Sequence, residues 1–69
     1  MVEIFKTDVS KKTKAKNILS ILEKKFPHLK ANFDLGDCDK ILRVEGTIIS
    51  VEKIISLMEK QTYLCEWLQ

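Results

Sequence analysis

Two runs of apolar residues at helical spacing decide most of what this chain can fold into. The first run spaces its apolar side chains three or four positions apart, at Ala15, Ile18, Leu19, Leu22 and Phe26. Such spacing puts them on one stripe of an amphipathic helix. We expect this helix to begin after Ser10, a good N-cap residue, and to end near Phe26 because Pro27 follows. The second run predicts a helix over residues 50–61, with Ser50 at its start, and its stripe comprises Val51, Ile54, Ile55 and Met58.

Four shorter segments have the pattern of strands: residues 2–7, 31–35, 40–45 and 63–68. Residues 31–35 alternate strictly between apolar and polar, and residues 36–39 have turn chemistry, which together predict a hairpin. In the returning strand we expect Leu42 and Val44 to face the core. The element order is therefore strand, helix, strand, strand, helix, strand. Laying both helices on one face of a four-stranded antiparallel sheet buries both stripes, which predicts an α+β, ferredoxin-like βαββαβ sandwich.

Length and composition fit a single small domain over residues 1–69. The chain is 45% hydrophobic and 32% charged, which favours a compact fold over disorder. No apolar run approaches the roughly 20 residues that a membrane span requires, so we expect no membrane partner. Two distant cysteines and no signal peptide argue against a disulfide framework. We therefore expect a cytoplasmic protein.

Lysines crowd the start of the first helix, at Lys11, Lys12, Lys14 and Lys16. Positive charge there interacts unfavourably with the positive end of the helix dipole, which destabilises the helix by several tenths of a kcal/mol per residue. Two interpretations remain open: a solvated helix face, or a patch that attracts an anionic partner. The net charge of +2 and the single arginine, Arg43, argue against nucleic acid.

Several segments together resemble a known family. They are the pattern Ala15-x-x-Ile18-Leu19-x-x-Leu22, the passage Phe26-Pro27-His28-Leu29, the alternating residues 31–35, the Leu42-Arg43-Val44 strand and Tyr63. In these the chain resembles the heavy-metal-associated domains, which are copper-chaperone-like modules. The resemblance implies a ferredoxin-like fold and a Cys-x-x-Cys pair in the first loop that holds Cu(I) or Zn(II). The corresponding positions fall at about Val9 and Lys12, which offer no metal donor, so we expect a degenerate metal site and no metal at this loop.

Other candidate ligands and catalytic groups lack the necessary pattern. Cys38 and Cys65, with Asp37 and Asp39, are the alternative: an atypical copper or zinc carrier. Two thiols without a third ligand make a weak zinc site, and the acids miss the calcium-loop spacing. They fit turn formation and charge pairing with nearby lysines. The chain shows no catalytic triad, no phosphate-binding glycine loop and no zinc-protease motif, so we expect no enzyme and no cofactor.

The sheet face away from the helices is expected to carry large apolar side chains. One assignment puts Phe5, Ile41, Leu64 and Leu68 there; in the other, Leu64 and Leu68 face the helices and Tyr63 and Trp67 lie outside. Either leaves an apolar patch that monomers rarely expose. RNA-recognition sheets stack bases on central aromatics, and Phe5 is the only such residue expected here. We therefore expect a protein-interaction module, using a protein partner or a homodimer through the open sheet face, or a partner at the lysine-rich helix start.

Overall fold

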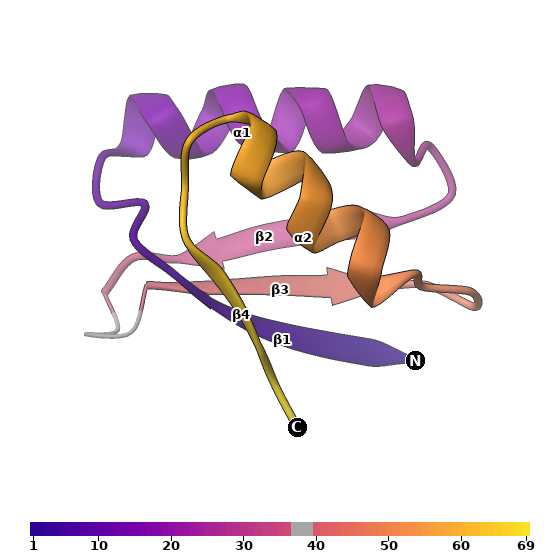
Figure 1. Cartoon of the computed structure of the whole chain (residues 1–69). Coiled ribbons are helices and arrows are strands. Elements are labelled where there is room, and N and C mark those ends of the chain that lie inside the picture. Colours follow the sequence, from indigo (N-terminus) through magenta and orange to yellow (C-terminus); the bar gives the residue numbers. More distant parts are fainter. Residues whose placement is uncertain (37–39) are drawn as a thin grey trace.

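The computed structural model describes residues 1–36 and 40–69, and their elements follow the expected order. These are β1 (Val2–Thr7), α1 (Lys12–Lys25), β2 (Lys30–Asp34), β3 (Ile41–Glu45), α2 (Val51–Lys60) and β4 (Cys65–Leu68). The strands form one sheet in the order β2-β3-β1-β4, and every neighbouring pair is antiparallel. Figure 1 shows both helices on one side of this sheet. The predicted α+β, ferredoxin-like sandwich is confirmed.

The core lies between the helices and one face of the sheet. Phe5 pairs with Leu42, and Leu42 pairs in turn with Phe33, so these three side chains share the helix-covered face. Phe5, Leu42 and Val44 are at most 1% exposed, as predicted for the last two. Above them lie residues of both helical stripes, together with Leu57 beside the second stripe: Ala15, Ile18, Leu22, Ile54, Leu57 and Met58. Burying each large side chain stabilises the fold by about 1.5–3 kcal/mol.

Phe5 corrects one prediction. It was expected on the open face as an interaction residue, but it is 0% exposed beneath the helices. Because strand residues alternate between faces, placing Phe5 inside turns Val2 and Ile4 outward. A small core needs its largest side chain at its centre, and β1 is a central strand. The aromatic side chain therefore goes to the packed face, and the aliphatic pair goes to the open one.

The start of α1 corrects a second prediction. The helix begins at Lys12, its N-cap residue is Lys11, and no side chain caps it. Ser10 therefore does not cap the helix. The reason lies one residue earlier, where Val9 is 0% exposed and anchors the loop in the core. The chain crosses Ser10 and Lys11 as exposed residues, with Lys11 extended, before it turns into the helix.

Helix α2 has the predicted cap at its start and a Schellman motif at its end. The backbone N–H of Lys53 donates to Ser50 Oγ at 3.4 Å. At the other end, the N–H of Thr62 donates to the Glu59 carbonyl and that of Tyr63 donates to the Met58 carbonyl. These two bonds define the motif, whose left-handed residue is usually glycine. Here Thr62 occupies that position, with a φ of 68°.

The register of β4 decides which of its side chains face the helices. Cys65 pairs with Thr7 and Trp67 pairs with Phe5, so both lie on the helix-covered side. Leu68 pairs with Ile4 and therefore lies on the open face. Of the two assignments left open by the sequence, the one that places Leu68 and Ile41 outside is correct for these two residues and wrong for Phe5. Among the described residues, no helix has the length and apolar character needed to cross a membrane.

Candidate functional site

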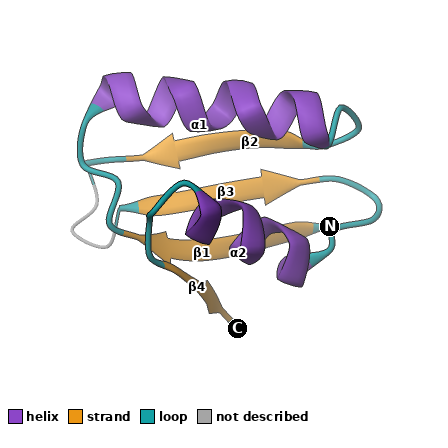
Figure 2. Cartoon of the chain, turned by 45° about the horizontal axis from the view of Figure 1, so that its top comes forward, coloured by secondary structure: helices purple, strands orange, loops and turns teal. Residues whose placement is uncertain are grey.

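The first candidate site is the end of the molecule where the β1–α1 loop meets the α2–β4 turn, as Figure 2 shows. Thr7, the last residue of β1, is buried and ties this end together. Its hydroxyl donates to the Lys40 carbonyl at 2.7 Å and accepts the N–H of Val9 at 3.2 Å. Asp8 adds a second tie, because its Oδ1 accepts the N–H of Leu64 at 2.9 Å. The connection between β1 and α1 is thereby fixed to two distant segments.

Val9 and Lys12 occupy the two positions where the resemblance places metal-binding cysteines. The Val9 side chain belongs to the hydrophobic core, and Lys12 is the exposed first residue of α1. A soft cation needs thiolate or imidazole donors, whereas this loop offers a buried hydrocarbon and an ammonium. The donor set of these two residues does not fit the ion that the resemblance implies.

Cys65 is the one residue of the alternative metal set that lies in the described part of the chain. It is half-buried against the core on the helix-covered face. Burial, and secondly the carboxylate of Glu59, raise the pKa of its thiol from 9.0 to about 11. Metals and electrophiles react with the thiolate, so this environment favours the unreactive form near neutral pH. Asp37, Cys38 and Asp39 lie outside the described residues.

No cluster of three or more histidine, cysteine or acidic side chains arranged to hold a metal occurs within residues 1–36 and 40–69. Of the alternative ligands that the sequence suggested, this part of the chain holds Cys65, and the acidic side chains near it, such as Glu59, do not complete a group of three with it.

The four predicted lysines do come together, on the exposed surface at the start of α1. Lys11, Lys12, Lys14 and Lys16 are all exposed, and the first turn contains no acid. Within the described residues, none of them forms an ion pair. Residues 12–25 contain five lysines and one glutamate, a net charge of 5 − 1 = +4, against +2 for the whole chain. The rest of the chain is therefore net negative, and the positive charge is concentrated on α1.

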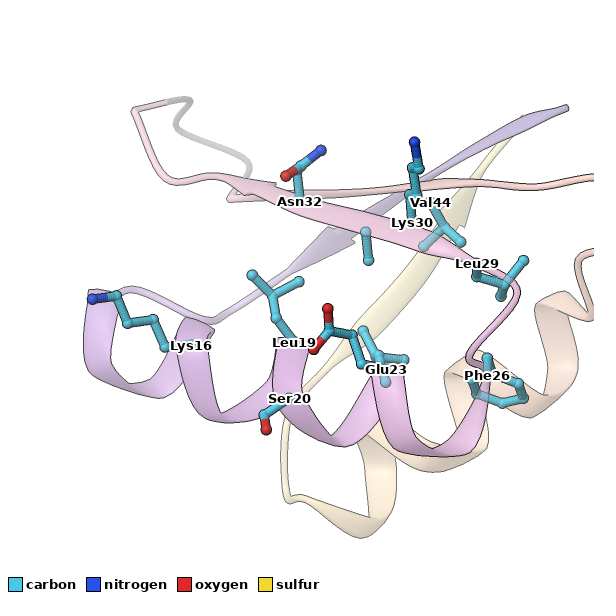
Figure 3. A pocket seen from close by; sticks show the side chains of 11 residues that line it. Lys16, Leu19, Ser20, Glu23, Phe26, Leu29, Lys30, Asn32 and Val44 are labelled. Atoms are coloured by element: carbon cyan, nitrogen blue, oxygen red, sulfur yellow. The ribbon is translucent and has the colours of Figure 1, made fainter.

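A groove of about 400 Å³ lies between α1 and the edge strand β2. Figure 3 shows Leu19 and Glu23 pointing from α1 toward the strand, while the Asn32 and Lys30 side chains extend to the other side of the sheet. The apolar lining includes Leu22, Phe26, Leu29, Ala31 and Val44. Sequence reasoning missed this groove, because it forms where the margin of a helical stripe meets β2, an edge strand that is paired on one side only.

The open sheet face carries apolar side chains among charges of both signs. Ile41, predicted here, pairs with Lys6 and lies on this face, half-buried. Val2 and Ile4 of β1 and Leu68 of β4 continue the apolar strip. Arg43 and Glu45 form an ion pair on it at 2.9 Å. Leu64, which was also predicted on this face, lies immediately before β4 and is 73% exposed.

Comparisons with protein-family models, with curated proteins and with solved structures found no match. The resemblance to heavy-metal-associated domains therefore stays a prediction from the sequence pattern, and the functional argument depends on the surfaces described above.

Proposed function

We propose that this chain is a non-enzymatic interaction domain that binds an acidic protein segment at the lysine-rich start of α1. The observation that carries the proposal is the concentration of charge there. Four exposed lysines lie within residues 11–16, with no acid in the first helical turn. The uncapped amides and the positive end of the helix dipole add to the same field. An anionic partner would relieve a repulsion that the isolated chain retains.

The partner class follows from the chemistry of the patch. Lysines attract carboxylates as point charges and accelerate encounter with an acidic surface. Nucleic-acid recognition relies heavily on arginine, and the sole arginine lies on the opposite face, paired with Glu45. In terms of the resemblance, Lys12 would supply the positive charge that a bound ion supplies in heavy-metal-associated domains. The loop end would then stay attractive to an acidic partner without an ion.

The test compares charge reversal at the two ends of one helix. The double variant Lys12→Glu, Lys14→Glu brings the summed charge of the four lysine positions from +4 to 2 − 2 = 0. The control Lys24→Glu, Lys25→Glu makes the same change in net charge at the far end of α1, where both residues are also exposed. We measure binding of a fluorescent glutamate- and aspartate-rich peptide, and capture of partners by the immobilised chain. Binding should be lost in the first variant and largely retained in the second. Equal binding by both variants would reject the patch as the site.

A further inference from the structure

We infer that the open sheet face binds a second copy of this chain, giving a face-to-face homodimer around Ile4. This goes beyond the proposed function, which uses the helix side of the molecule. The apolar members of the face lie on its two central strands and β4: Val2, Ile4, Ile41 and Leu68. Val2 is 45% exposed and Leu68 is 37% exposed. Water-exposed aliphatic side chains of this size, side by side, are typical of a surface that is covered in the working assembly.

The charges of the face identify the occupant. The face carries three cations, Lys6, Lys30 and Arg43, and three acids, Asp34, Glu45 and Glu66, on the outward positions of the four strands. Its formal charge is 3 − 3 = 0, although α1 is strongly positive. A neutral face with both signs does not select an acidic or a basic partner. It does fit its own rotated image, which is the requirement for an isologous interface.

The register shows how two copies would fit. Asn32, Arg43, Ile4 and Leu68 form the middle row across the sheet. A twofold axis along this row stacks Ile4 on Ile4 and Leu68 on Leu68 of the second copy. It also places Lys30, two residues before Asn32, over Asp34 of the second copy, two residues after it. The two sheets then keep their strands roughly aligned, as packed sheets prefer.

The middle row also brings Arg43 near Arg43 of the second copy. This repulsion is reduced because each guanidinium is already bound to Glu45 of its own chain at 2.9 Å. A twofold axis parallel to the strands is less favourable. That axis would set Asp34 over Glu66 of the second copy, which pairs like charges, whereas the axis along the middle row pairs Lys30 with Asp34.

The face is large enough for a stable pair. A specific interface buries about 800 Å² per partner, and the whole surface of this chain measures 4856 Å². About one sixth of the surface would be covered. The sheet is one full side of a two-layer molecule whose extents are 27 × 24 × 18 Å, so its open face can supply that area.

The first experiment places a charge at the centre of the interface. Native mass spectrometry and light scattering of the whole chain should show a dimer, and Ile4→Lys should weaken dimerisation by about a hundredfold or more, because two buried ammonium groups would meet. The matched control is Ile48→Lys, at a loop residue that is 75% exposed. The control should dimerise like the unaltered chain. Circular dichroism should show that both variants are folded.

The second experiment tests the orientation by exchanging charges. Lys30→Asp and Asp34→Lys should each weaken self-association about tenfold, because two exposed pairs change from attraction to repulsion at about threefold each. When the two variants are mixed, they should form a one-to-one heterodimer in preference to either homodimer. The double exchange Lys30→Asp, Asp34→Lys should restore self-association.

Specific outcomes would overturn the inference. A chain that stays monomeric at millimolar concentration rejects the homodimer. A dimer that Ile4→Lys leaves intact rejects this face. A dimer that is lost in Ile4→Lys but shows no heterodimer preference rejects the stated twofold axis. Acidic-peptide binding by α1 is measured separately, and it is expected to persist in Ile4→Lys whatever the result here.

Discussion

The hydroxyl of Thr7 offers the sharpest test of what holds the loop end together. We consider Thr7→Val, which keeps the shape of the side chain and removes only its hydrogen-bonding oxygen. The hydroxyl donates to the Lys40 carbonyl at 2.7 Å and accepts from the N–H of Val9 at 3.2 Å. The Lys40 carbonyl keeps a second donor, the Thr7 N–H at 3.3 Å. The N–H of Val9 loses its acceptor inside the protein.

The expected loss of stability comes mainly from the Val9 N–H, which is left without an acceptor. A buried donor without a partner costs about 1–3 kcal/mol. Loss of the hydrogen bond from the Thr7 hydroxyl to the Lys40 carbonyl, taken by itself, costs about 1 kcal/mol more. Partial compensation by the more apolar valine leaves an expected loss of about 2 kcal/mol in the free energy of unfolding. For a domain of this size that corresponds to a melting temperature lower by about 10 °C. A core this small supplies only about 3–5 kcal/mol in total, so the effect is large.

The control is Thr7→Ser, which keeps the oxygen and loses one methyl group, a loss of about 1 kcal/mol. Urea unfolding followed by circular dichroism should therefore rank the chains as unaltered, then serine, then valine. If packing alone held this end, valine would match or exceed threonine and serine would be the least stable. That reversed order would refute the reasoning.

Four further outcomes are expected. Thr62→Gly should raise the free energy of unfolding by about 0.5–1 kcal/mol, because glycine adopts the left-handed conformation without strain; an unchanged melting temperature would contradict this. Lys12→Glu, Lys14→Glu should raise stability by about 0.3–1 kcal/mol per residue, since acids suit a helix start, while peptide binding falls; a parallel loss of both would point to misfolding. The raised pKa of Cys65 means that the unfolded chain loses its thiol proton near pH 9 and the folded chain near pH 11. Stability should therefore fall as pH rises through that window, modestly because the thiol is half-exposed, and Cys65→Ser should remove this component. Titration of the reduced protein with Cu(I) and Zn(II), followed by native mass spectrometry, should show no stoichiometric ion; one that is lost in Cys38→Ser would favour the metal-carrier alternative.

Much of the fold could be predicted because its strongest signals are periodic. The helical stripes and the alternation of residues 31–35 each predict which side of the helix or strand is buried. With short connections, these patterns leave few ways to cover both stripes, and the sandwich is the simplest. Leu42 and Val44 were placed correctly for the same reason, because the charged Arg43 between them indicates which face of the strand is exposed to solvent.

The errors occurred where local pattern and tertiary packing disagree. In β1, Glu3 shares a face with Phe5, so polarity alone did not show which side was buried, and the register with Leu42 decided it. Ser10 looked like a cap, but the burial of Val9 moved the helix start to Lys12. Val9 is surrounded in sequence by polar and charged residues, so no hydrophobic pattern indicates that its side chain belongs to the core.

The surfaces differ in how far sequence could reveal them. The four lysines are adjacent in sequence, so a helix gathers them automatically. The open face combines residues from strands that are distant in sequence, and only the register assembles them. The groove is formed by consecutive segments, α1 and β2, with Val44 of β3, and its shape depends on how the helix packs on the strand. Charge balance on the open face, in particular, depends on which member of each alternating pair points outward.

The arrangement of both helices on one side of the sheet has a consequence for assembly geometry. The lysine-rich start of α1 and the open sheet face lie on opposite sides of the molecule, so a partner bound to one leaves the other accessible. In the face-to-face homodimer the two basic helices would lie on the two opposite outer sides. A binding protein with two tethered acidic stretches would then engage both at once, and its avidity would depend on the length of the tether as much as on any single contact.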